Sequence, residues 1–114
     1  FFQPMLMELP HEECHVMMLR NNLTLKGTFL VGRGGITESA VDIRLILEAA
    51  LRNQSTAIVL CHNHPSGSLT PSTMDKNLTR QLAEACRIMN IRLLDHVIVS
   101  DQGYFSFKDQ GLMD

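Results

Sequence analysis

The stretch from Cys61 to Asp75, CHNHPSGSLTPSTMD, constrains this chain more than any other feature. It follows Thr56–Leu60, a β-branched and apolar run that is typical of a buried strand. If that strand continues through His64, period-2 alternation places His62 and His64 on one side of it, about 6.6 Å apart along the backbone. Two imidazoles at this spacing can converge on one ion. The pattern predicts a metal site at the end of a central strand.

A helix predicted after this strand adds a carboxylate. Thr70 is suited to the N-cap of this helix and Pro71 to its first position. Its apolar stripe consists of Leu78, Leu82, Ala85, Cys86 and Met89. Followed backwards, the stripe reaches Asp75 and then Ser72. The face that enters the core is therefore expected to carry a carboxylate and a hydroxyl in its first turn.

His62, His64 and Asp75 offer nitrogen and oxygen donors of the kind that zinc accepts. A catalytic zinc takes three protein ligands and leaves the fourth position to water, whereas a structural zinc has four. No fourth ligand is evident, because Cys61 adjoins His62 and would point to the other side of the strand. The set favours hydrolysis by a zinc-activated water. Such a reaction also uses a carboxylate that is not a ligand, and a donor such as serine for the oxyanion.

Each signal also has a purely structural explanation. Two histidines at alternate positions occur by chance at strand ends. Ser72 and Asp75, taken alone, are more often a capping box, in which each side chain accepts a bond from the other residue's backbone N–H. His96 is predicted to be a sheet histidine that is hydrogen-bonded locally to Asp95 and is not a ligand. The signals gain force only through their combined order and spacing.

Two hairpins are predicted at the ends of the chain. Cys14–Arg20 and Leu23–Val31 are expected to pair around Asn21-Asn22, because asparagine tolerates positive φ. Arg92–Ser100 and Tyr104–Phe107 are expected to pair around a glycine-containing turn.

A further helix is predicted between the first hairpin and the central strand. Ser39 and Asp42 form its expected capping box, and it ends near Asn53. Its buried stripe is predicted to be Ile43, Ile46, Leu47, Ala50 and Leu51. The resulting order is strand, strand, helix, strand, helix, strand, strand. This order predicts a mixed α/β (α+β) domain with a twisted, largely antiparallel sheet and two main helices.

Length and composition narrow the classes of function. The 114 residues suffice for one domain, which we expect over residues 12–114, with residues 1–11 as the tail of a preceding segment of a longer protein. The net charge of -2 and the few aromatic residues argue against nucleic-acid binding by this fragment. Three cysteines without paired spacing indicate reduced thiols and a cytoplasmic protein. No apolar run is long enough to cross a membrane.

The order of the site residues resembles the JAMM (MPN+) motif of zinc metalloproteases, H-x-H-x7-S-x2-D, which acts on peptide or isopeptide bonds. His62, His64, Ser72 and Asp75 match it without a gap. The sequence around this motif is similar to that of the RadC family. HNHPSG, the following PS-x-x-D, LLDHVIVSDQGYFSF and the final GLM look like that family's JAB-type domain, over nearly all of residues 12–113.

This resemblance implies a cytidine-deaminase-like JAB/MPN fold and one zinc held by the two histidines and Asp75. It implies that Ser72 helps to bind the oxyanion, and that a glutamate at the head of an early strand orients the catalytic water. Glu12 fits that glutamate by its spacing to the apolar residues of the strand, and Glu13 is the alternative. Only one of the two can serve, because adjacent strand residues face opposite sides.

The leading hypothesis is a zinc-dependent hydrolase of an amide bond in a peptide or protein. The alternative is a non-catalytic binding module of a DNA-repair-associated protein, and a third possibility is a metal-stabilised scaffold. The resemblance carries the DNA-repair label, whereas the sparse basic stripe of Lys76, Arg80 and Arg87 indicates a solvated face. The sequence names no particular substrate or oligomeric state.

Overall fold

The computed structural model describes residues 11–33 and 41–113, which contain five strands and two helices. Their bounds are β1 (Glu13–Leu19), β2 (Leu25–Arg33), α2 (Ile43–Arg52), β3 (Ala57–Asn63), α3 (Thr73–Ile88), β4 (Arg92–Ser100) and β5 (Gly103–Ser106). The predicted order of elements is confirmed. Residues 1–10 of the predicted tail lie outside the described part. No helix in the described ranges is long and apolar enough to span a membrane.

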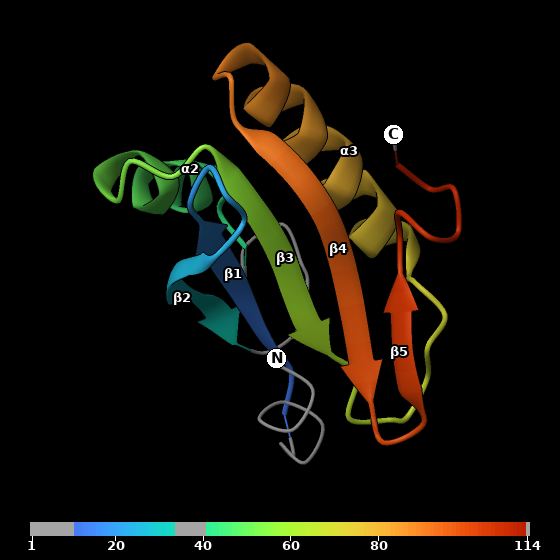
Figure 1. Ribbon diagram of the computed structural model, residues 1–114. Coiled ribbons are helices and arrows are strands. Elements are labelled where there is room, and N and C mark those ends of the chain that lie inside the picture. The colour runs from blue at the N-terminus through green and yellow to red at the C-terminus, as the bar shows by residue number, and fades with distance from the viewer. Residues whose placement is uncertain (1–10, 34–40, 114) are drawn as a thin grey trace.

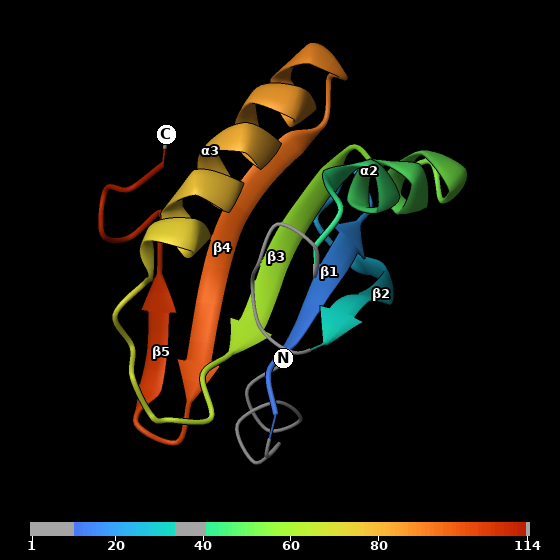
Figure 2. The same cartoon turned by 180° about the vertical axis from the view of Figure 1, so that it is seen from behind.

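The strands form one twisted sheet in the order β2-β1-β3-β4-β5 (Figure 1). All neighbouring strands pair antiparallel except β3 and β4, which are parallel. Helix α3 makes the crossover that two parallel strands require. Seen from behind, both helices lie on the same face of the sheet (Figure 2). The largely antiparallel α/β architecture predicted from the sequence is therefore present, and β3 lies at its centre.

The main core lies between this face of the sheet and the two helices. Alternation along β1 and β3 turns one residue in two toward the helices. The strand side of the core is formed by Cys14, Val16, Met18, Ile58 and Leu60. The helix side is formed by Ile46, Ala49, Ala50, Leu78, Leu82 and Cys86. The same alternation points His62, the last histidine of β3, toward the helices as well.

The opposite face of the sheet carries a smaller cluster in which Cys61 and Val99 are buried against Met17 and Val97. No helix of the described ranges covers it (Figure 1). Cys61 thus faces away from His62, as the alternation predicted. Burial raises the pKa of the Cys61 thiol to about 12, so it is an inert packing residue and not a ligand.

The helix starts differ from the prediction. The N-cap of α2 is Asp42 itself, whose carboxylate accepts a bond from the Arg44 N–H; the predicted partner Ser39 lies outside the described residues. Leu51 was assigned to the buried stripe, but it is 50% exposed, because the inner face of α2 is carried by Ile46 and its neighbours. The C-cap is Asn53, where the helix was expected to end.

Helix α3 begins after Ser72, and the predicted N-cap Thr70 is wrong. Ser72 replaces it because its side chain and the side chain of Asp75 each bond the other residue's backbone, which makes a complete capping box. At the other end, Met89 is the C-cap and is exposed, so it does not belong to the buried stripe. The helix ends at Ile88, one residue before the last residue of the predicted apolar stripe.

The second strand of the first hairpin is shifted by two residues relative to the prediction, and the first strand by one. The positive φ of 66° falls on Leu23 and not on the asparagines, and β2 begins only at Leu25. The turn is closed instead by bonds from Arg20 N–H to the Thr24 carbonyl and from Leu23 N–H to the Arg20 carbonyl. In the last hairpin, β5 begins at Gly103, whose φ of 126° suits glycine.

Candidate metal centre

His62, His64 and Asp75 meet where β3 ends and α3 begins. The Nε2 atoms of the two histidines are 3.0 Å apart. Asp75 Oδ1 lies 3.3 Å from Nε2 of His62, and Asp75 Oδ2 lies 3.5 Å from Nε2 of His64. In the described part of the chain, these three residues are the group whose side chains could hold a metal ion. The residues predicted from the strand alternation and from the apolar stripe of the helix thus lie together in the structure.

Each of the three side chains is positioned by its own element. His62 is the second-last residue of the central strand and is fully buried. His64 lies one residue beyond β3, but its N–H still donates to the Val99 carbonyl at 2.9 Å, which keeps it in line with the sheet. Asp75 is held by the capping box, because its Oδ2 accepts the Ser72 N–H at 2.7 Å. The helix cap therefore also aims the carboxylate at the histidines.

The hydrogen bonds on the far side of the His64 ring determine which nitrogen carries its proton. His64 Nδ1 lies 3.0 Å from the Ser68 carbonyl, which can only accept a hydrogen bond. The proton of neutral His64 is therefore on Nδ1, and the lone pair of Nε2 points at His62 and Asp75. A second-layer acceptor of this kind commonly orients metal-binding histidines.

The spacing of the donor atoms fits zinc. Zinc–ligand bonds of about 2.0–2.1 Å at tetrahedral angles put two ligand atoms about 3.3 Å apart. The two Nε2 atoms are 3.0 Å apart, and they lie 3.3 and 3.5 Å from different oxygens of Asp75, so these separations lie on either side of that value. Two imidazole nitrogens and one carboxylate also form a set that zinc accepts at catalytic sites. The residues present therefore fit the metal that the motif implies.

The pKa values at this site follow from its charges. Burial alone would raise the pKa of Asp75, but the adjacent imidazoles of His62 and His64 lower it overall, so Asp75 is ionised. The bond to Asp75 raises the pKa of His64, against the effect of burial, and the more distant charge of Glu12 adds to it. The centre is thus an anionic pocket with imidazole donors, which is the environment that a cation requires.

Ser72 is placed beside the ligand Asp75 in the capping box. Its Oγ accepts the Asp75 N–H at 3.0 Å. Because this bond uses a lone pair, the hydroxyl proton of Ser72 remains available to donate. Ser72 is therefore a helix cap, and its hydroxyl can donate a second hydrogen bond at the same time.

Glu12 and Glu13 face opposite sides, and their surroundings differ. Glu13 lies in a cluster with His11, His15 and Arg33, at 2.9, 2.9 and 3.1 Å from its carboxylate oxygens. Bonds from His15 and then His11, with a further contribution from Arg33, lower the pKa of Glu13 to about 2. The Glu13 carboxylate thus links β1 to β2 through its bonds with His15 and Arg33.

Glu12 precedes β1 and shares its side with Cys14 by alternation. Cys14 pairs with His62 across the sheet and belongs to the core under the helices. Burial chiefly raises the pKa of Cys14, and the bond to Asp75 chiefly raises the pKa of His64; the charge of Glu12 adds a smaller contribution to both. Strand alternation therefore places Glu12, and not Glu13, on the Cys14 side of the sheet.

Asn63, between the two histidines, is a functional candidate that sequence reasoning missed. Its side chain is buried and reaches the backbone on both sides of Glu12. Oδ1 accepts the Glu13 N–H at 2.6 Å, and Nδ2 donates to the His11 carbonyl at 2.9 Å. The residue therefore fixes the main chain that presents Glu12.

His96 is a sheet histidine bonded to Asp95 and is not among the predicted ligands, as expected, but its ring has a contact that the sequence did not predict. Its backbone N–H does bond the Asp95 carboxylate at 2.8 Å, but its ring lies against the metal centre. His96 Nε2 is 2.8 Å from Nδ1 of His62. Burial, followed by the neighbouring His62, lowers the pKa of His96 far below its ordinary value, so this ring is neutral. The contact with His62 was not predicted, because it joins side chains of two neighbouring strands, which local spacing does not reveal.

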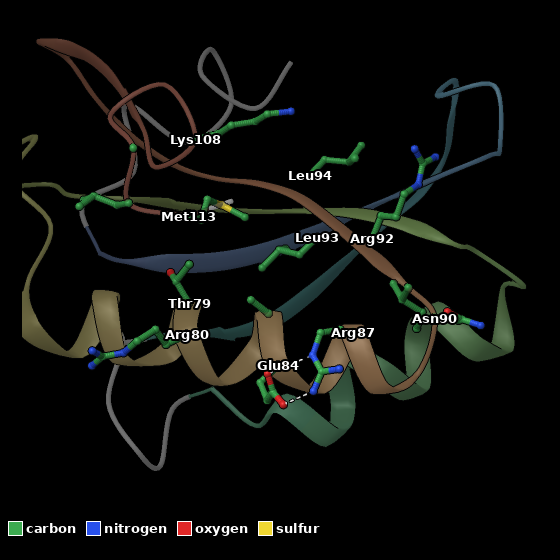
Figure 3. A pocket seen from close by; sticks show the side chains of 14 residues that line it. Thr79, Arg80, Glu84, Arg87, Asn90, Arg92, Leu93, Leu94, Lys108 and Met113 are labelled. Atoms are coloured by element: carbon green, nitrogen blue, oxygen red, sulfur yellow. Dashed lines mark hydrogen bonds and ion pairs between the residues drawn. The ribbon is translucent and has the colours of Figure 1, made fainter.

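A separate open groove of about 850 Å³ lies between α3, β4 and the C-terminal residues (Figure 3). Arg80, Arg87, Arg92 and Lys108 line it, and Glu84 forms an ion pair with Arg87 at 2.5 Å. The predicted ligands do not line it; Thr79 alone links its wall to the His96 ring. The groove is therefore distinct from the metal centre.

Comparison with known proteins places the chain in a family. The model of the RadC-like JAB domain matches residues 1–112. A protein named UPF0758 protein from Flavobacterium johnsoniae is 42% identical over 110 residues, covering 96% of this chain and 48% of the relative. Its counterpart in Porphyromonas gingivalis is 41% identical over 111 residues, covering 96% and 49%.

A UPF0758 protein from Symbiobacterium thermophilum is 38% identical over 113 residues, covering 99% of this chain and 48% of the relative. The chain spans about half the length of these relatives. The match extends over the strand, loop and helix that carry the metal-binding group. This chain belongs to the RadC-like JAB domain family.

Proposed function

We propose that this domain is a zinc-dependent hydrolase that cleaves a peptide or isopeptide amide bond. The observation that carries the proposal is that His62, His64 and Asp75 each offer a donor atom within 4.8 Å of the other two, with the two imidazole Nε2 atoms 3.0 Å apart. No further ligand joins this group in the described residues, which corresponds to the open coordination position of a catalytic zinc. The JAMM-type order of the residues supports the reaction class.

The roles of the other residues follow from where they lie. Zinc, when bound, lowers the pKa of a water molecule to about 7 and so supplies a nucleophile at neutral pH. Glu12 is the carboxylate that takes the proton of the attacking water and delivers it to the leaving amine. Ser72, whose hydroxyl proton is available, donates to the developing oxyanion. The substrate is a peptide or protein, which matches the acidic balance of the chain better than nucleic acid does.

The test begins with the metal content of protein purified without added metal. We expect about one zinc per chain, removable by a chelator. His62→Ala and Asp75→Ala should each lower the occupancy, and full occupancy in the double variant would contradict the assignment. Protein that holds zinc is then assayed on a broad panel of peptides and isopeptides. If the parent holds zinc but cleaves nothing, the domain is a binding module and the proposed hydrolysis is wrong.

A further inference from the structure

A continuous series of hydrogen bonds runs behind the metal centre through Thr79 and His96. His62 Nδ1 lies 2.8 Å from His96 Nε2, and His96 Nδ1 lies 2.5 Å from Thr79 Oγ1. Thr79 Oγ1 in turn donates to the Asp75 carbonyl at 2.9 Å. The chain therefore starts at the backbone of one ligand, Asp75, and ends on the ring of another, His62.

The residues of this chain are rigidly placed. Thr79 lies one helical turn after Asp75 on the buried face of α3. His96 lies in β4 opposite Leu60 of β3, and its side chain is fully buried. Its ring stacks on Phe107, with centroids 4.4 Å apart and planes within 7°. Side chains held in this way have no room to exchange one partner for another.

The direction of the chain follows from the groups at its end. The Asp75 carbonyl can only accept, so it takes the single hydroxyl proton of Thr79. Thr79 Oγ1 must then accept from His96, which puts the proton of the neutral His96 ring on Nδ1. His96 Nε2 is left with a lone pair, so it accepts a proton from Nδ1 of His62. Each step permits one arrangement of the next.

We infer that Thr79 and His96 are positioning residues that hold His62 in the tautomer whose Nε2 lone pair faces the metal centre. His64 reaches the same state by a shorter route, through the Ser68 carbonyl. The inference rests on the proposed function in one respect, the metal centre itself. It gives a positioning role to two residues that are not predicted ligands, Thr79 on α3 and His96 on β4.

Thr79→Val tests the chain, because valine keeps the branched shape but lacks the hydroxyl. The loss leaves His96 Nδ1 without an acceptor, which favours its other tautomer, with the proton on Nε2. That proton would be donated to His62 Nδ1 and would move the His62 proton to Nε2, where it blocks metal binding. We expect the affinity for Zn²⁺, measured by chelator competition, to fall about 10- to 100-fold.

Two variants serve as controls. Thr79→Ser keeps the hydroxyl and should restore the affinity, which a purely packing role for the Thr79 methyl group would not explain. Thr73→Val makes the same chemical change at an exposed position of α3 and should leave the affinity unchanged. Unchanged affinity in a folded Thr79→Val protein would overturn the inference.

A second measurement does not depend on the variant folding or on any metal being bound. Nitrogen-15 NMR of metal-free parent protein, well above the ordinary histidine pKa of about 6.5, reports which ring nitrogen of His62 carries the proton. A proton on Nδ1 supports the inference, and a proton on Nε2 overturns it. If the parent binds no zinc, the proposed function fails, whereas the tautomer measurement still decides the inference.

Discussion

The side chain of Asn63 holds the backbone on both sides of Glu12. It accepts the N–H of the residue after Glu12 and donates to the carbonyl of the residue before it. Since Asn63 lies between His62 and His64 at the end of β3, one side chain links the backbone around the predicted base to the segment that carries the two predicted histidine ligands. The position of Glu12 therefore depends on a residue that is not itself one of the predicted ligands.

Asn63→Ala should slow hydrolysis while leaving zinc in place. It removes both bonds to the backbone around Glu12, so the carboxylate loses its fixed position. We expect turnover to fall by about 10²-fold and the free energy of unfolding to fall by about 1–3 kcal/mol, because polar backbone groups lose their partners. Zinc content and steady-state kinetics measured on the same preparation check this. Unchanged turnover would show that Glu12 needs no such support.

Glu12→Gln should abolish hydrolysis without loss of zinc, because an amide cannot take the proton of the attacking water. Glu13→Gln is the matched control. It should leave turnover per folded molecule nearly intact, since Glu13 faces the His11 and Arg33 side of the sheet. The two variants are compared by kinetics and metal content. Should Glu13 prove essential and Glu12 dispensable, the mechanism would stand with the residues exchanged.

Ser72→Ala separates the two roles of one hydroxyl. Losing the cap should lower the free energy of unfolding by about 1 kcal/mol. If the hydroxyl also donates to the oxyanion, turnover should fall by about 10²-fold or more with zinc still bound. Denaturant unfolding and kinetics at saturating substrate measure the two effects. A loss of stability with no loss of turnover would leave Ser72 as a helix cap only.

Acid should weaken the fold through Glu13. Its pKa is lowered from 4.5 to about 2, chiefly by hydrogen bonds from His15 and His11, so the ionised form is favoured in the folded state. A lowered folded-state pKa gives stability that is fully present above about pH 4.5 and is lost as the pH falls toward 2. Glu13→Gln should therefore be less stable than the parent at neutral pH and should lose less stability on acidification.

Urea unfolding at neutral pH and near pH 3 measures this difference. Glu48→Gln, on the exposed surface of α2, is the control and should follow the parent at both pH values. Parallel losses of stability in Glu13→Gln and parent would contradict a role for Glu13 in the acid sensitivity.

Local periodicity was sufficient for the ligands. Alternation along β3 placed His62 inward, and the helical stripe of α3 led back to Asp75. Both patterns are set by neighbours within a few residues, so they can be read without knowing the fold. The same stripe led to Ser72, whereas its expected role at the oxyanion and the expected catalytic glutamate, Glu12 or Glu13, came from the family resemblance.

Contacts across the sheet could not be predicted in this way. His96 meets His62 only because β4 pairs with β3 in the register that sets Leu60 opposite His96. Asn63 meets the backbone around Glu12 because β1 lies on the other side of β3. Neither register is encoded within either segment. The choice of Ser72 over Thr70 as N-cap likewise depends on which residue closes a reciprocal pair with Asp75.

The capping box of α3 has one more consequence. Asp75 is anchored by the helix start, and both imidazoles are anchored by bonds to the fold, so folding itself brings the ligands together. The protein would therefore need little rearrangement of its backbone to bind an ion. Zinc fingers are the opposite case, since they fold only around their metal. In this domain, binding and release of the metal would depend on access of ions to the site and on competition among them. The protein would stay folded after the metal was removed.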